Sequence, residues 1–89
     1  MLIRLIVHQG SEDFVLTRIA QGEVMLTVLD RKRHVYLHPH FRSAERLDKL
    51  LHLYQYVAPW DMTDEMRNNV MDALPEELND FLRFAFNLK

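Results

Sequence analysis

In the middle of the chain, every second residue from 34 to 40 carries a polar ring: His34, Tyr36, His38 and His40. Alternate residues share one face of a β-strand, and an H-x-H pair such as His38 and His40 can give two imidazole ligands to a transition metal. Such a metal needs three or four ligands, and His34 would lie about 13 Å from His38 along a strand. We therefore expect neither a metal site nor a cofactor. We interpret these histidines as half-exposed sheet and turn residues whose charge responds to pH.

A basic turn directly precedes the histidines, and more basic residues follow them. A nucleic-acid site here would combine positive charge with a ring for base stacking. Its residues would be Arg31, Lys32, Arg33, Tyr36, Arg42 and Arg46. The whole chain is acidic on balance, with a formal net charge of −2, and it has no recognisable nucleic-acid-binding motif. A nucleic-acid-binding module is therefore the alternative function. The turn is explained more simply as a charged hairpin tip that disfavours pairing with the sheets of other molecules.

Residues for covalent or acid–base catalysis are sparse. The chain has no cysteine and 2 glycines, which argues against thiol chemistry and against a glycine-rich phosphate-binding loop. Both serines stand where a turn or a helix N-cap is expected. The carboxylate pairs Asp64 with Glu65 and Glu76 with Glu77 stand in predicted helical first turns, where the helix dipole explains them. We expect that the protein is not an enzyme.

The first forty residues alternate between apolar and polar side chains with the period of two that is typical of β-strands. Strands are predicted near residues 2–8, 13–20, 23–30 and 33–39, joined as a meander because consecutive strands usually lie side by side. A helix between Ser11 and Gln21 is the alternative for the second run, but β-branched residues there favour the strand. The residues predicted to anchor the core from the central hairpin are Val24, Leu26, Val28, Val35 and Leu37.

From Ser43 the apolar spacing changes to that of amphipathic helices. The predicted helices span residues 43–57, 63–74 and 75–87. Ser43 is the expected N-cap of the first helix, Pro59 ends it, and Trp60 is expected to cover a corner of the core. The inner stripe of the third helix is predicted to continue to Leu88.

The fold class is therefore α+β: a four-stranded antiparallel meander over residues 2–40 and three helices packed on one sheet face. At 89 residues the chain has room for one core, so we expect a single domain over residues 1–89. This order of elements is similar to that of many small bacterial and phage regulators, which is a likeness of fold alone.

Composition places the chain among ordinary globular domains, with 48% hydrophobic and 27% charged residues. The absence of cysteine is compatible with a reducing compartment. The apolar residues 1–7 are too few for a secretory or membrane-spanning segment. We expect a cytoplasmic protein that does not associate with membranes.

Charge and apolar side chains point to contacts with other proteins. Formal charge sums to −1 over residues 1–29, +3 over 30–52 and −4 over 53–89, which together give −2. The sheet face opposite the helices would carry Leu2, Ile6, Met25 and Leu29, which is unusually apolar for a solvated face. Clustered exposed apolar groups usually mark protein partners or self-association.

The sequence therefore favours a small non-enzymatic interaction module, namely a regulator, adaptor or inhibitor that binds a larger protein. Three contact surfaces are predicted: a basic tip (Arg31, Lys32, Arg33, with Tyr36 beside it), acidic helix starts (Asp64, Glu65, Glu76, Glu77) and an aromatic patch (Trp60, Phe84, Phe86). Acidic helices can offer carboxylates where phosphates would bind, so a nucleic-acid-handling machine is one candidate partner. A homo-oligomer is compatible with this, because the positive middle and the negative C-terminal third are complementary between copies.

Overall fold

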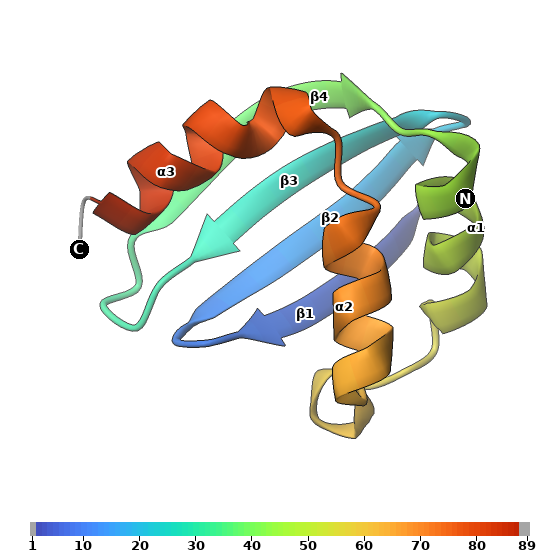
Figure 1. The fold of residues 1–89 in the computed structure, drawn as a ribbon, viewed down its shortest axis with the longest axis horizontal. Helices are drawn as coiled ribbons and strands as arrows, with labels where there is room; N and C mark the ends of the chain where they lie inside the picture. The colour runs from blue at the N-terminus through green and yellow to red at the C-terminus, as the bar shows by residue number, and fades with distance from the viewer. Residues whose placement is uncertain (1, 88–89) are drawn as a thin grey trace.

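The computed structural model describes residues 2–87, which form one antiparallel sheet followed by helices (Figure 1). The strands are β1 (Ile3–Gln9), β2 (Glu12–Ala20), β3 (Glu23–Leu29) and β4 (Val35–Arg42). They lie in the order β1-β2-β3-β4, and every neighbouring pair is antiparallel. The predicted four-stranded meander is confirmed. The alternative helix between Ser11 and Gln21 is not formed, because that run pairs with a strand on each side.

Two glycines close the first two hairpins. Gly10 and Gly22 have positive φ angles of 61° and 74°, a conformation that glycine adopts readily because it has no Cβ atom. Each glycine lies in a two-residue connection between paired strands, a length that fixes the register of a hairpin. The first turn aligns Leu16 of β2 with Leu5 of β1. A register shift of one residue at Ile19 then aligns Leu16 with Leu26 of β3, so the three leucines share the buried face of the sheet.

The helical half consists of three α-helices and two short 3₁₀ turns. Its elements are α1 (Glu45–Tyr54), η1 (Pro59–Asp61), α2 (Asp64–Asp72), η2 (Glu76–Leu78) and α3 (Asn79–Asn87). Thr63 caps α2, because its hydroxyl oxygen accepts a hydrogen bond from the backbone N–H of Met66 at 3.1 Å. The prediction that Ser43 caps α1 is wrong: Ala44 holds the N-cap position, and Ser43 is buried one residue earlier. The predicted inner-stripe residue Leu88 lies outside the described residues.

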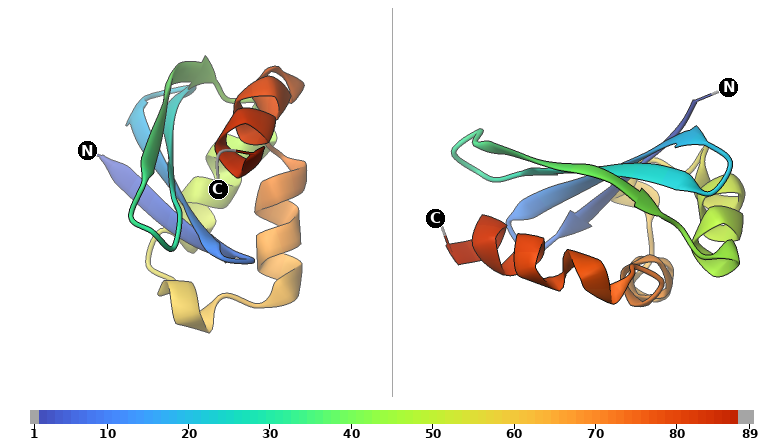
Figure 2. Two further views of the ribbon diagram at one scale, coloured as in Figure 1. Left: turned by 90° about the vertical axis from the view of Figure 1, so that its left-hand side faces the viewer. Right: turned by 90° about the horizontal axis from the view of Figure 1, so that it is seen from above.

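All three α-helices lie on one face of the sheet, as predicted (Figure 2). The core fills the space between the two layers. Its fully buried members include Leu5, Phe14, Leu16, Leu26, Leu47, Leu51, Val70 and Leu78. The sheet therefore has a covered inner face and an outer face over which no described element lies.

Strand β4 presents the opposite face from the one predicted. Val35 and Leu37 were expected in the core, but their exposed fractions are 55% and 66%. Tyr36 instead pairs with the fully buried Val28 and faces the helices. Because paired residues on neighbouring strands share a face, the length of the loop between β3 and β4 decides which side chains of β4 point inward.

A β-bulge then restores an apolar residue to the inner face near the end of β4. His38 pairs with Leu26 and Phe41 pairs with Val24, so the two residues Pro39 and His40 lie opposite Met25 alone. Bulges at sheet edges commonly accommodate proline, which cannot donate to the ladder. As a result Phe41 is 3% exposed although Leu37, four residues earlier, points outward.

Candidate functional site

The basic tip is a closed loop that connects β3 to β4 and is organised by Asp30. The Asp30 carboxylate accepts hydrogen bonds from the backbone N–H groups of Lys32 and His34, both at 2.9 Å. Arg33 has a φ of 65°, and no other non-glycine residue among residues 2–87 has a positive φ. This conformation is strained for an L-residue with a long side chain. Arg31, Lys32 and Arg33 are all exposed. The loop thus presents three cations on a frame held by hydrogen bonds to Asp30.

Hydrogen bonding keeps Asp30 ionised although it is only 6% exposed. Burial by itself would raise the pKa of Asp30, but the backbone and ring of His34 and the backbone of Lys32 together hold the pKa below its ordinary value of 3.8. The His34 ring nitrogen Nδ1 lies 3.1 Å from the carboxylate. Asp30 is therefore a structural anion that builds the tip.

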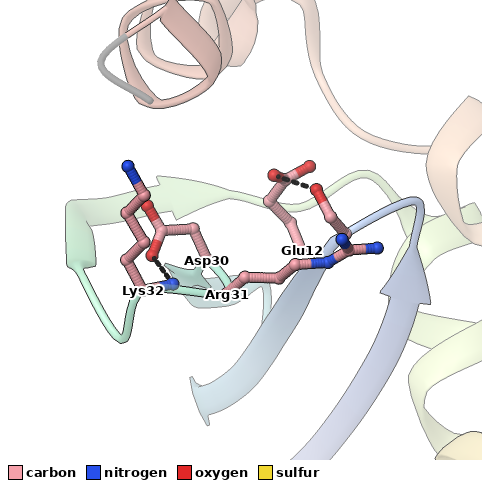
Figure 3. A pocket seen from close by; sticks show the side chains of 5 residues that line it. Glu12, Asp30, Arg31 and Lys32 are labelled. Atoms are coloured by element: carbon pink, nitrogen blue, oxygen red, sulfur yellow. Dashed lines mark hydrogen bonds between the residues drawn. The ribbon is translucent and has the colours of Figure 1, made fainter.

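A small hollow lies between the tip and the turn that joins β1 to β2 (Figure 3). Its volume is about 160 Å³, and Ser11, Glu12, Asp30, Arg31 and Lys32 line it. The Glu12 carboxylate accepts a hydrogen bond from the Ser11 hydroxyl at 2.8 Å, and Asp30 holds the loop amides. Both carboxylates thus accept hydrogen bonds from the loops that line the hollow.

The histidines do not converge. His34 lies beside Asp30, the His38 ring stands edge-on to Phe81 with centroids 5.1 Å apart, and His40 lies 3.9 Å from Glu23. Within residues 2–87 there is no group of three or more His, Cys, Asp or Glu side chains that could hold a metal ion. Each histidine instead has its own local contact.

The residues predicted to bind nucleic acid are separated by the fold. Tyr36 is half-buried, and its ring stands edge-on to Phe84 of α3 with centroids 6.1 Å apart. Arg42 lies at the far end of β4 from the tip, a distance of about 23 Å for seven steps along a strand. Of the residues predicted to bind nucleic acid, Arg42 is therefore remote from the tip and Tyr36 is packed on Phe84, whereas the ring of His34 is exposed beside the tip.

Three large apolar side chains are exposed near the end of α1 and in the segment that follows it. Leu53, Tyr56 and Trp60 have exposed fractions of 70%, 89% and 80%, and we call these three residues the aromatic segment. The prediction that Trp60 covers a corner of the core is therefore wrong. The sequence analysis missed Leu53 and Tyr56, although both fall outside the apolar stripe of the helix predicted over residues 43–57, which is the signal that could have identified them.

Acidic residues follow the aromatic segment directly. Asp61 ends η1, and Asp64 and Glu65 begin α2; all three are exposed, and Asp64 also forms an ion pair with Arg67. The other predicted acidic start, Glu76 with Glu77, lies beyond the opposite end of α2 (Figure 1). A helix of nine residues is about 13 Å long, so the two acidic groups are separate surfaces.

The predicted aromatic patch is likewise divided. η1, which carries Trp60, and α3, which carries Phe84 and Phe86, lie at opposite ends of the helical layer (Figures 1 and 2). The Phe86 ring packs on the buried Phe14 ring with centroids 5.8 Å apart, so Phe86 is half-buried and was wrongly expected outside the inner stripe. Phe84 remains 55% exposed.

In comparisons with known proteins, no family model, no curated protein and no solved structure matches this chain. Among the described residues, no helix has the length and apolar character needed to cross a membrane.

Proposed function

We propose that the protein is a small non-enzymatic interaction module that binds a larger protein through the aromatic segment and the acidic start of α2. The observation that carries this proposal is the exposure of Leu53, Tyr56 and Trp60 within eight residues of chain, at 70%, 89% and 80%. Leaving large apolar side chains in water is unfavourable, and burying each against a partner would recover on the order of 2 kcal/mol.

The residue types suit a binding surface. Tryptophan and tyrosine dominate the energetics of protein interfaces because they bury a large area with few rotatable bonds. Asp61, Asp64 and Glu65 add negative charge beside the rings, and charge at the rim of an interface speeds and orients association with a partner of the opposite sign. The favoured partner therefore has an apolar pocket surrounded by basic residues.

A protein that handles nucleic acid is one source of such a surface, since it already binds phosphates with lysine and arginine. Carboxylates of this chain would then occupy phosphate positions. The alternative, in which the chain itself binds nucleic acid through Arg31, Lys32 and Arg33, has less support. Tyr36, the ring predicted to stack on bases, is half-buried against Phe84, and Arg42 is about 23 Å from the tip along the strand.

The test is affinity capture from the native cell with the wild-type chain and matched variants, followed by measurement of affinity for the captured protein. Tyr56→Ala with Trp60→Ala is expected to weaken binding about 30-fold or more, because an interface hot spot contributes about 2 kcal/mol. Phe84→Ala is the matched aromatic control, since Phe84 is exposed on a different element.

Charge is tested with a second matched pair. Asp64→Ala with Glu65→Ala is expected to slow association and reduce its dependence on salt, whereas Glu76→Ala with Glu77→Ala should have little effect. Retention of full affinity by the Tyr56 and Trp60 double variant would refute the proposed surface. A capture that yields nucleic acid and depends on Arg31, Lys32 and Arg33 would support the alternative instead.

A further inference from the structure

The outer face of the sheet, on the side away from the helices, is an apolar surface that no described element covers (Figure 2). Antiparallel pairing aligns one row of residues across all four strands: Ile6, Val15, Thr27 and Leu37. In the next row towards the basic tip, Leu29 of β3 pairs with Val35 of β4. Leu37 is 66% exposed and Val35 is 55% exposed. A solvated antiparallel face usually carries polar residues at such positions, so this face is suited to contact with another protein.

The charges of this face cancel. The Asp, Glu, Lys and Arg residues on its outward strand positions are Arg4, Asp13, Glu23 and Arg42, and their formal charges sum to zero. Two of them also have local partners, since Asp13 pairs with His8 and Glu23 lies 3.9 Å from His40. In a two-fold symmetric dimer the same patch meets itself, so a patch with a strong net charge would repel its copy. A neutral patch avoids this penalty, unlike the basic tip or the acidic helix starts.

The size of the face matches a second sheet better than a single strand. Four strands spaced ~4.8 Å apart and seven residues long, at ~3.3 Å per residue, form a rectangle of roughly 440 Å². Two such rectangles total roughly 900 Å², and protruding side chains raise the accessible area above this flat figure, towards the ~1,000 Å² or more that a specific interface buries. An added peptide strand would cover only about a quarter of this area.

Pairing through the open edge of β4 is disfavoured. Pro39 has no N–H group to donate, and the bulge at Pro39 and His40 interrupts the regular ladder. The bulge borders a shallow hollow of about 570 Å³ that is lined by Met25, Leu37, His38, Pro39 and His40. A face-to-face arrangement can use this hollow to receive a protruding side chain of the opposite sheet.

We propose that the outer face is the interface of a homodimer, in which two copies pack sheet against sheet with their helices directed outwards. Packed sheets lie about 10 Å apart and interdigitate side chains from both faces. The row from Ile6 to Leu37 forms the centre of this interface, and the charged residues lie around it. The aromatic segment belongs to the helical layer, so this dimer does not depend on the proposed binding of a larger protein.

The test is the mass of the full chain in solution over a range of concentrations, measured by sedimentation equilibrium. The wild-type chain should reach twice its monomer mass of 10.7 kDa. Leu37→Lys should raise the dimer dissociation constant on the order of 100-fold, because it places an unpaired charge at the centre of the interface. Leu53→Lys is the matched control, since Leu53 is 70% exposed on α1 and should leave the dimer unchanged.

Leu37→Thr is a milder second variant, and it retains a side chain that is favourable in a strand. Circular dichroism and thermal unfolding establish that each variant is folded. A wild-type chain that stays monomeric at the highest concentration overturns the proposal. So does a dimer that both Leu37 variants form as tightly as the wild type, or one that Leu53→Lys abolishes.

Discussion

The orientation of β4 can be tested by comparing two neighbouring residues, Tyr36 and Leu37. Hydrophobicity alone predicts that truncating Leu37 costs more, but the structure predicts the reverse. Tyr36 is half-buried against α3, and burial of roughly 100 Å² of apolar surface at about 25 cal/mol per Å² contributes about 2.5 kcal/mol. Its edge-on contact with the Phe84 ring, at a centroid distance of 6.1 Å, adds about 0.5 kcal/mol or more.

Tyr36→Ala should therefore lower the free energy of unfolding by about 3 kcal/mol. For a domain of this size that change corresponds to a fall in Tm of roughly 15 °C. Leu37→Ala should change the free energy of unfolding by no more than about 0.5 kcal/mol, because Leu37 is 66% exposed.

The measurement is urea unfolding followed by circular dichroism, with both variants and the wild type at a concentration where the chain is monomeric. Working with monomers matters because Leu37 also lies in the proposed dimer interface. Equal losses for the two variants, or a larger loss for Leu37→Ala, would refute the assigned face of β4 and with it the exposed row on the outer face.

Two further predictions concern the basic tip. Stability should fall as the pH drops below 3.8, because a carboxyl group whose pKa is lowered in the folded state stabilises the fold above its ordinary pKa and loses that contribution as pH falls through the folded value. Asp30→Asn should lower stability at neutral pH and flatten this acid dependence in urea titrations, and parallel curves for the two proteins would contradict the role of Asp30. Arg33→Gly should raise the free energy of unfolding by about 0.5–1 kcal/mol, because glycine accepts the φ of 65° without strain. A loss of stability in the same urea assay would mean that the Arg33 side chain holds the loop.

Local patterns were sufficient to predict the element order of this protein. The period of two, the glycines at 10 and 22 and the β-branched residues predict the meander, because strand alternation and positive φ are properties of short stretches of chain. The cap of α2 is a local contact of the same kind, since the Thr63 side chain accepts from an amide three residues later. The fold class and the helices on one sheet face are therefore readable from neighbouring residues.

The candidate surfaces were less predictable, because they depend on residues that are far apart in the chain. Tyr36 and Phe86 are half-buried only because α3 packs over the sheet, and that contact joins residues separated by tens of positions. In the same way, the exposure of Trp60 depends on how η1 packs against the edge strand β1, which is about fifty residues away in the chain.

Sequence by itself determined which segments form strands and helices, since those choices rest on local backbone preferences and apolar periodicity. Tertiary structure alone decided which face of β4 points inward. Alternate residues of the strand share a face, so either Val35 with Leu37 or Tyr36 with His38 could face the helices. The loop closed by Asp30 sets the pairing of Val28 with Tyr36, and this single register turns Val35 and Leu37 to the outer face. The apolar outer surface of this protein therefore results from strand register, which the composition of β4 does not specify.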